Sequence, residues 1–292
     1  MSGPSDRKAG KGFGVEPAKT AIGDRQFRRV AAYIQAETGI KMPVTKAQMI
    51  EGRLVRRVRE GGFESMDDYC EHILSGYASD EAVDDFINAI TTNKTDFFRE
   101  PGHFDYLAQH ILPALREQRC RRIRCWSAAA STGMEAYTLA MMLDDFVAEQ
   151  RDMDYFILAT DIDTNVLAEA RRGIYPHVAL APVPAAMRAR YVVNARDPQR
   201  KEGRIIPELR RKVGFARLNL MDNHYPVGEP MDVIFCRNVL IYFERDVQAK
   251  VIARLCDNLR PGGHLILGHS ESIHGLDLPL ITVANTVFKK KG

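Results

Sequence analysis

The chain has 292 residues, a hydrophobic fraction of 45%, a charged fraction of 27% and a formal net charge of +3. These values are ordinary for a globular protein that buries a sizeable core without disulfides. No apolar run reaches the length of a membrane span, and the N-terminus lacks the apolar segment of a signal peptide. We therefore expect a cytoplasmic protein with no direct membrane insertion.

The cysteines are odd in number and form neither a CxxC pair nor a His/Cys cluster at metal-ligand spacing. This pattern favours free thiols in a reducing compartment, and no metal is expected. The five residues are Cys70, Cys120, Cys125, Cys236 and Cys256.

Residues 1–22 are rich in Gly, Lys, Ser and Pro and predict a disordered tail. From residue 23 to about residue 90 the pattern is helical. Phe27, Val30 and Ile34 recur at helical spacing, and "TKAQMIEGRLVRRVREGG", "SMDDYCEHILSG" and "SDEAVDDFINAITT" each predict a further helix. The last two open with Ser followed by acidic residues, which suits a helix N-terminus. The sequence thus predicts an N-terminal unit of four helices over 23–90.

Residues 91–102 begin with "TTNKTDFFRE", which is too polar for a core strand and too aromatic for a plain linker. Taken alone, this stretch reads as an interdomain linker whose two phenylalanines dock it on apolar surface.

Residues 103–292 alternate between helical and strand patterns. "RRIRCWSAA", "DYFILATDID", "GFARLNL", "MDVIFCRNVL" and "PGGHLILGHS" predict strands, most of them separated by helices. This order predicts an α/β domain with a doubly wound parallel sheet. "LITVANTVFKK" predicts one closing strand, at an edge or antiparallel. The polar stretch at about 195–217 interrupts the alternation and predicts a small antiparallel β insert.

Ligands bind such sheets at the carboxyl ends of the strands, and four of these ends carry suggestive residues. "WSAAASTGMEAY" combines small side chains with a helix N-terminus, although an ordinary tight turn explains it equally well. Asp161 is placed to accept ribose hydroxyls, whereas Asp163 suits the N-cap of the next helix. The remaining candidates, each with an ordinary turn or core interpretation as well, are Asn219, Leu220, Arg237, Asn238 and Tyr242.

Six separated stretches, "TTNKTDFFRE", "WSAAASTGMEAY", "ATDIDT", "RRGIY", "IFCRNVLIYF" and "PGGHLILGHSES", together resemble the CheR family of chemoreceptor glutamate O-methyltransferases. The resemblance runs from about residue 25 to the C-terminus. It implies a small all-helical domain followed by a Rossmann-like class I methyltransferase sheet. It also implies methyl transfer from S-adenosylmethionine, leaving S-adenosylhomocysteine, to glutamate carboxylates in chemotaxis.

The resemblance also implies roles for particular residues. The connecting stretch would lie over the cofactor, with Arg99 and Tyr242 nearest the reacting groups. Met134 and Ala136 depart from the usual Glu and Pro of the family, but Glu135 retains the carboxylate between them. The implied cofactor-binding residues are Asn93, Thr95, Arg99, Glu135, Asp161, Asn219, Leu220, Arg237 and Asn238.

A basic helix in the N-terminal unit is the implied docking surface for the cytoplasmic methylation helices of chemoreceptors. Arginine suits such a partner because its forked guanidinium matches carboxylates. A solvated basic face is the plain alternative. Whether the β insert holds a receptor C-terminal tail stays open. The docking residues are Arg53, Arg56, Arg57 and Arg59.

Two alternatives remain at this stage. Nucleic-acid methyltransferases that modify base nitrogens usually carry a [DN]-P-P-[YF] motif after the fourth strand, where this chain has "CRNVLIYF"; we therefore expect no nucleic-acid partner. A non-catalytic module that binds S-adenosylmethionine for signalling is the other alternative, and the departures at Met134 and Ala136 keep it open.

Overall fold

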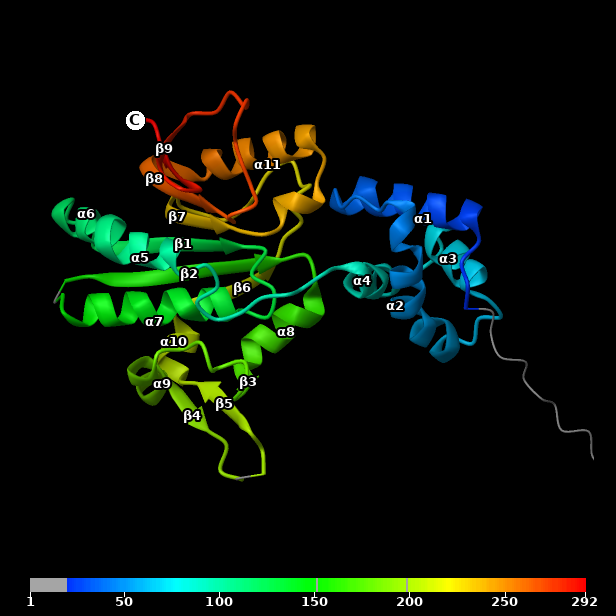
Figure 1. Cartoon of the computed structure of the whole chain (residues 1–292), viewed down its shortest axis with the longest axis horizontal. Coiled ribbons are helices and arrows are strands. Elements are labelled where there is room, and N and C mark those ends of the chain that lie inside the picture. The colour runs from blue at the N-terminus through cyan, green and yellow to red at the C-terminus, as the bar shows by residue number, and fades with distance from the viewer. Residues whose placement is uncertain (1–19, 151, 198) are drawn as a thin grey trace, which may run out of the picture.

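The computed structural model describes residues 20–150, 152–197 and 199–292 (Figure 1). The tail expected at 1–22 therefore lies almost entirely outside the described residues. The described part of the chain forms a helical unit followed by an α/β unit that carries a small second sheet.

The helical unit contains α1 (Asp24–Thr38), α2 (Ala47–Glu60), α3 (Met66–Leu74) and α4 (Asp80–Ile90), with a short 3₁₀ turn at Val44–Lys46. Ser65 and Ser79 cap α3 and α4, and each side chain accepts a bond from a backbone N–H of the first turn. Val30, Leu54 and Phe86 are fully buried between the helices. The helical spacing in the sequence therefore corresponds to one apolar core.

The main sheet has the strand order β6-β2-β1-β7-β8-β10-β9. Its parallel strands are β1 (Arg122–Ala128), β2 (Asp154–Asp161), β6 (Val213–Arg217), β7 (Met231–Cys236) and β8 (Leu259–Leu267). The order reverses between β1 and β7. This is the point at which doubly wound sheets bind ligands, because neighbouring crossovers leave on opposite sides.

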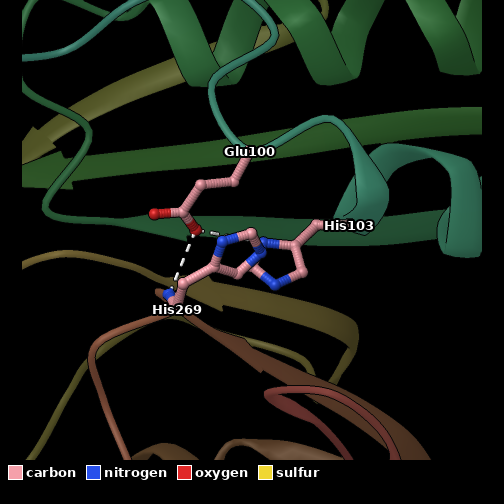
Figure 2. A group of neighbouring side chains, drawn as sticks. All are labelled: Glu100, His103 and His269. Atoms are coloured by element: carbon pink, nitrogen blue, oxygen red, sulfur yellow. Dashed lines mark hydrogen bonds and ion pairs between the residues drawn. The ribbon is translucent and has the colours of Figure 1, made fainter.

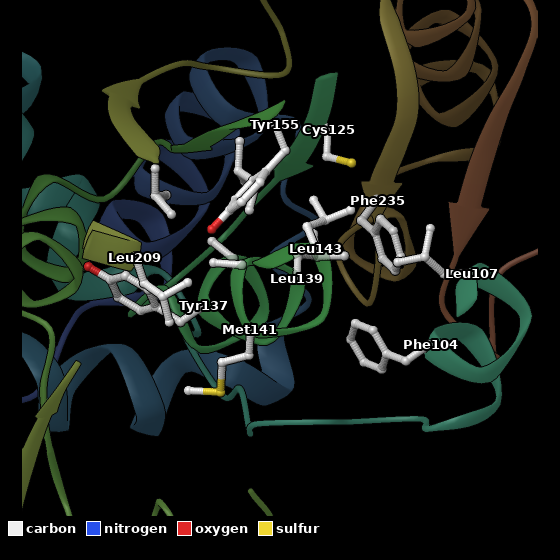
Figure 3. Close-up of a cluster of buried hydrophobic side chains, with 14 of the residues drawn as sticks. Phe104, Leu107, Cys125, Tyr137, Leu139, Met141, Leu143, Tyr155, Leu209 and Phe235 are labelled. Carbon is white, nitrogen blue, oxygen red and sulfur yellow. The ribbon is translucent and has the colours of Figure 1, made fainter. Parts of the chain in front are cut away.

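Helices cover both faces of this sheet (Figure 1). Every residue of β7 is buried, and alternate residues belong to different cores. Val233 and Phe235 pack on the side of α7 (Met134–Ala148), as the buried cluster in Figure 3 shows for Phe235. Ile234 and Cys236 pack on the side of α11 (Arg245–Asp257). The continuous apolar run "VIFC" thus reflects burial on two faces.

The C-terminal stretch differs from the expected single strand. It forms a hairpin of β9 (Leu280–Ala284) and β10 (Val287–Lys290), in which Thr286 has a left-handed φ of 52°. β10 pairs antiparallel with both β8 and β9, so it lies inside the sheet and β9 forms the edge. The turn was missed because "NT" lacks the glycine that usually marks a tight hairpin.

The β insert also starts earlier than expected. Its strands are β3 (Ile174–Pro176), β4 (Val192–Asn194) and β5 (Glu202–Ile205), and they pair antiparallel in the order β3-β5-β4. The insert therefore extends N-terminal to residue 195, and β6, placed partly within it by the sequence, pairs with β2. Strands of three residues are too short to show a period of two, which explains the misplaced boundary.

Residues 91–101 join the two units without regular structure, and this stretch together with Gly102 is called the connecting segment below. α5 (Gly102–Tyr106), a π-helical turn (Leu107–Ile111) and α6 (Leu112–Glu117) follow. Pro113 has no N–H to donate, so the helix register changes just before it. α8 (Thr164–Arg172), α9 (Ala185–Tyr191) and α10 (Pro207–Arg211) complete the helices described here.

Candidate active site

A cleft lies where the helical unit meets the carboxyl ends of the main strands. The connecting segment, α1 and the loops after β1, β2, β6 and β7 all contribute to its lining. All nine of the expected cofactor-binding residues line it, and so does Tyr242. Met134 and Ala136 do not belong to the lining described, whereas Glu135 does.

The loop after β1 is a tight turn that brings backbone close to the cleft. Ala129 and Ser131 have left-handed φ values of 64° and 51°, and Gly133 follows with 84°. A Cβ at Gly133 would lie 2.8 Å from the Cβ of Ala170, so only glycine fits there. The turn leads directly into α7, whose first residues place Glu135 in the cleft.

Asp161 ends β2 with a carboxylate that is only 7% exposed. Its Oδ2 accepts a bond of 2.8 Å from the N–H of Ser131, and its Oδ1 accepts one of 3.0 Å from the N–H of Asp163. Burial raises its pKa to about 6 despite these donors. Each oxygen keeps a second lone pair, so the group can still accept hydroxyl donors from a ligand.

Asp163 has the expected capping role and a second role that the sequence did not indicate. Its Oδ1 accepts bonds from the N–H groups of Asn165 and Val166 at the start of α8. Its Oδ2 accepts bonds from Thr91 Oγ1 at 2.8 Å and from Asn93 Nδ2 at 2.6 Å. One carboxylate therefore fixes both a helix start and the beginning of the connecting segment.

The two phenylalanines anchor the connecting segment. Phe97 is 1% exposed, and its ring meets that of Tyr175 edge-on with centroids 5.0 Å apart. Phe98 packs against Phe104, with centroids at 5.8 Å. Phe98 and Glu100 both adopt left-handed φ values, 53° and 56°. The ring contacts of Phe97 and Phe98 stabilise these unusual backbone angles and so fix the conformation of the connecting segment over the cleft.

Arg237 is a buried ionic centre, which sequence reasoning treated only as a cofactor contact. Its side chain is 2% exposed. Nη1 donates to Glu135 Oε2 and Nη2 donates to Glu100 Oε2, both at 3.0 Å, and Nη2 also donates to the carbonyl of Arg99. The guanidinium lies 5.4 Å from the ring centroid of Phe104. Glu135 accepts a further bond of 2.7 Å from Ser127 Oγ.

Glu271 organises the loop after β7 and was not singled out by the sequence. Its buried carboxylate accepts N–H bonds from Asn238, Val239, Leu240 and Gly268. Asn238 has a left-handed φ of 57°. This single side chain therefore holds an unusual turn in place next to the cleft, as buried acceptors of several backbone donors commonly do.

Asn219 and Leu220 follow β6 and differ in what they offer a ligand. The amide of Asn219 is engaged on both sides, because Nδ2 donates to the carbonyl of Glu37 at 2.6 Å and Oδ1 accepts the N–H of Met221. The side chain thus joins the main sheet to the C-terminal end of α1. Leu220 is 7% exposed and supplies an apolar wall.

Arg99 and Tyr242 stand half-buried in the lining, in contrast to the enclosed Arg237. Arg99 Nη1 donates to the carbonyl of Lys94 at 2.9 Å. Lys46, a lining residue of the helical unit that the sequence analysis missed, places its Nζ 5.5 Å from the ring centroid of Tyr242. The three side chains provide hydrogen-bond donors and positive charge for an anionic group.

The four arginines of α2 divide into two pairs. Arg53 donates to the carbonyls of Ile90 and Thr91, and Arg57 pairs with Asp85, so both hold α2 against α4. Arg56 and Arg59 are exposed; Arg56 pairs only within its own helix, with Glu60. The predicted docking stripe therefore leaves two arginines on the outer surface.

Several carboxyl groups and one buried guanidinium lie in or beside the cleft. Asp161, Glu135, Glu100 and Glu271 bring four carboxyl groups, whereas Arg237 is the one buried guanidinium beside them within the described residues. A parallel sheet of this order, a glycine turn after β1, a buried acid after β2 and an apolar wall after β6 are the features of a doubly wound protein that binds a nucleoside at its switch point.

Two family models match nearly the whole described chain. The all-alpha domain of CheR methyltransferase matches residues 25–91, and the SAM-binding domain of CheR methyltransferase matches residues 93–288. The chain belongs to the CheR methyltransferase family, and it is a methyltransferase of chemotaxis that uses S-adenosylmethionine.

Curated relatives agree over most of their length. The chemotaxis protein methyltransferase of Escherichia coli K12 is 39% identical over 270 residues, which is 92% of each chain. A probable chemotaxis protein methyltransferase of Rhizobium etli is 40% identical over 83% of this chain and 90% of its own. Chemotaxis protein methyltransferase 2 of Pseudomonas aeruginosa is 38% identical over 90% and 91%. Among the described residues, no helix has the length and apolar character to cross a membrane.

The pKa of Asp161 leads to a first prediction. Above a pH of about 6 the carboxyl group is ionised and can serve as a charged acceptor for ligand hydroxyls; below this pH, protonation removes the charge. We expect the affinity for S-adenosylhomocysteine, measured by titration calorimetry, to fall as the pH is lowered from 8 to 5, by no more than about 1.4 kcal/mol, because pH 5 lies about one unit below this pKa. Asp161→Asn should bind weakly at every pH, without this slope. A wild-type affinity that stays constant between pH 8 and 5 would contradict the assignment.

Proposed function

We propose that the protein transfers the methyl group of S-adenosylmethionine to glutamate side-chain carboxylates of bacterial chemoreceptors. The observation that carries this proposal is the set of donors lining the cleft, Arg99, Tyr242 and Lys46, without a histidine among the described lining residues. Such a site receives an anion and lacks the usual general base. A glutamate needs none, because its pKa of about 4.3 leaves it ionised at neutral pH.

The residues present fit the cofactor. Asp161 offers a carboxylate for the ribose, Leu220 an apolar wall for the adenine and Glu135 an anion for the positively charged part. When bound, the cofactor would supply a methyl group on a sulfonium and would leave as the neutral thioether S-adenosylhomocysteine once the methyl has been transferred. Arg99 and Tyr242 orient the incoming carboxylate by hydrogen bonds, and the connecting segment excludes water. Donors that are half-exposed hold the carboxylate lightly, which preserves its nucleophilicity.

The proposal is tested with a radiolabelled methyl donor and purified cytoplasmic domains of chemoreceptors. We expect label on the receptor that is released by mild base, since a glutamyl methyl ester hydrolyses readily. A receptor whose methylation-region glutamates are replaced by glutamine should take up none. Label on RNA or DNA instead would support a nucleic-acid methyltransferase. Binding of S-adenosylhomocysteine without transfer to any acceptor would support a non-catalytic module.

We propose that the exposed pair Arg56 and Arg59 attracts the acidic methylation helices of the receptor. The double variant Arg56→Ala/Arg59→Ala is expected to raise the KM for the receptor several-fold, most strongly at low salt, because charges at a rim act through steering. Its affinity for S-adenosylhomocysteine should be unchanged.

The matched control replaces Arg25 and Arg28, which are exposed on α1 in the same helical unit. Arg25→Ala/Arg28→Ala removes the same charge and should leave the KM for the receptor near wild type. Equal effects of the two double variants would show that overall charge, not the surface of α2, attracts the receptor.

We further propose that the β insert receives a receptor C-terminal tail as an added strand. β3 and β4 are the outer strands of the three-stranded sheet, and Val193 of β4 is 59% exposed. An edge of this kind pairs with an extended peptide through main-chain bonds. Removal of the tail from the receptor should weaken its binding to the wild-type protein while leaving cofactor affinity unchanged.

A further inference from the structure

Glu100, near the end of the connecting segment, joins three separate segments beside the cleft. Its Oε1 accepts a bond of 3.0 Å from Asn238 Nδ2. Its Oε2 accepts one of 3.0 Å from Arg237 Nη2 and one of 3.2 Å from the backbone N–H of His269. The carboxylate thus ties the segment to the loop after β7 and to the loop after β8.

The Glu100 carboxyl group is held in its ionised form by the hydrogen bonds that it accepts. The side chain of Glu100 is 15% exposed, and burial alone would raise its pKa. The bonds from Asn238 and Arg237 outweigh this burial and lower the pKa to about 2. The connection therefore persists over the whole pH range in which the protein is folded and active.

Glu100, His103 and His269 also gather near one another, and their possible ligand atoms lie within 4.8 Å (Figure 2). His103 is 2% exposed, and its Nδ1 lies 3.5 Å from Glu100 Oε2 without a hydrogen-bond partner. A divalent ion is disfavoured here because both lone pairs of Glu100 Oε2 already accept N–H bonds. One of the two donors is the positively charged guanidinium of Arg237, which would repel a cation. The cluster therefore points to a protein contact network.

The neighbours of Glu100 are the residues assigned to the cofactor. Asn238 lines the cleft, and its side-chain Nδ2 donates to Glu100 Oε1, which fixes the direction of the amide. Arg237 would pair with Glu135 alone if Glu100 were removed. Glu135 in turn lines the cleft. A change at Glu100 therefore reaches cofactor-facing groups on two elements, although Glu100 is itself absent from the lining described.

We propose that Glu100 is a positioning residue for cofactor binding: its carboxylate fixes Asn238 and Arg237 beneath the connecting segment and so sets their orientation toward S-adenosylmethionine. This inference rests on the proposed cofactor contacts of these two residues. It goes beyond those contacts, because it identifies Glu100 as the group that pre-organises Asn238 and Arg237 in the ligand-free protein.

The test is titration calorimetry with S-adenosylhomocysteine on Glu100→Ala and Glu100→Gln, well below their melting temperatures. Glutamine keeps one acceptor oxygen for the three donors, but it loses the other oxygen and the charge. We expect Glu100→Ala to bind about tenfold to a hundredfold more weakly and Glu100→Gln to recover part of this loss. In a methylation assay the KM for S-adenosylmethionine should rise more than kcat falls.

Asp105→Asn is the matched control, because Asp105 is an exposed acid five residues further along, on α5. It should bind like wild type. A folded Glu100→Ala protein that binds within twofold of wild type would overturn the proposal, as would a loss that glutamine does not reduce at all. The calorimetric result does not depend on which molecule accepts the methyl group. A wild-type protein that binds the ligand but leaves receptors unlabelled would therefore refute only the proposed function.

Discussion

Arg237→Met is expected to destabilise the protein by about 3–5 kcal/mol, because it leaves two buried carboxylates without their shared counter-charge. Glu135 and Glu100 are 12% and 15% exposed at the side chain, and Arg237 bonds to both. Such a loss is a large part of the roughly 5–15 kcal/mol by which domains are stable. Urea denaturation measures it, and binding of S-adenosylhomocysteine should be lost as well.

Arg217→Ala is the control for this experiment. Arg217 pairs with Asp84 on the surface, with side chains 49% and 33% exposed, and such pairs contribute no more than about 1 kcal/mol. Arg237→Lys should fall between the two variants, since an ammonium keeps the charge but cannot fork to both carboxylates. A loss below about 1 kcal/mol for Arg237→Met would contradict the description of Arg237 as an ionic centre.

Arg99→Ala is expected to lower kcat for receptor methylation by about 10²-fold with little effect on stability. The side chain is half-buried and makes a single hydrogen bond, to a carbonyl of its own segment, so its removal leaves no buried charge behind. Misplacing the acceptor carboxylate by about 1 Å is enough to cause a loss of this size. Single-turnover kinetics at saturating S-adenosylmethionine would measure it.

Tyr242→Phe should lower the same rate less, because the ring still packs in the cleft and only one hydroxyl donor is lost. Arg116→Ala, which removes an exposed arginine on α6, should leave the rate unchanged. An Arg99→Ala protein with the wild-type rate would refute the assignment of Arg99 to the reacting carboxylate.

The helical unit and the parallel strands could be predicted because burial there leaves a periodic trace. Phe27, Val30 and Ile34 recur at helical spacing and are all buried on α1, and β7 carries the apolar run "VIFC" because both of its faces are covered. The hairpin of β9 and β10 and the early start of the β insert left no such trace. Their strands are short, and Thr286 adopts a left-handed φ that is unusual for threonine and could not be expected from the residue type.

The location of the candidate residues in one cleft could be predicted from the sequence, but the hydrogen bonds among them could not. The matched motifs placed nine residues in one cleft, and all nine line it. No pattern indicated that Asp163 would bind the connecting segment or that Glu271 would hold four backbone N–H groups. Asp163 is 70 residues from Asn93, and Glu271 is 31 to 33 residues from the three N–H groups that it binds after β7. Only the folded chain brings them together.

The walls of the cleft come from both units, and this has a consequence for loss of function. Thr38, Ile40 and Lys46 of the helical unit line the same cleft as Asp161 at the end of β2 and Leu220 after β6. A nucleoside bound in this cleft would contact both units. Its binding free energy therefore includes the free energy of holding the two units in this arrangement. A substitution that destabilises the helical unit would thus weaken cofactor binding, even if it leaves every side chain that contacts the cofactor unchanged.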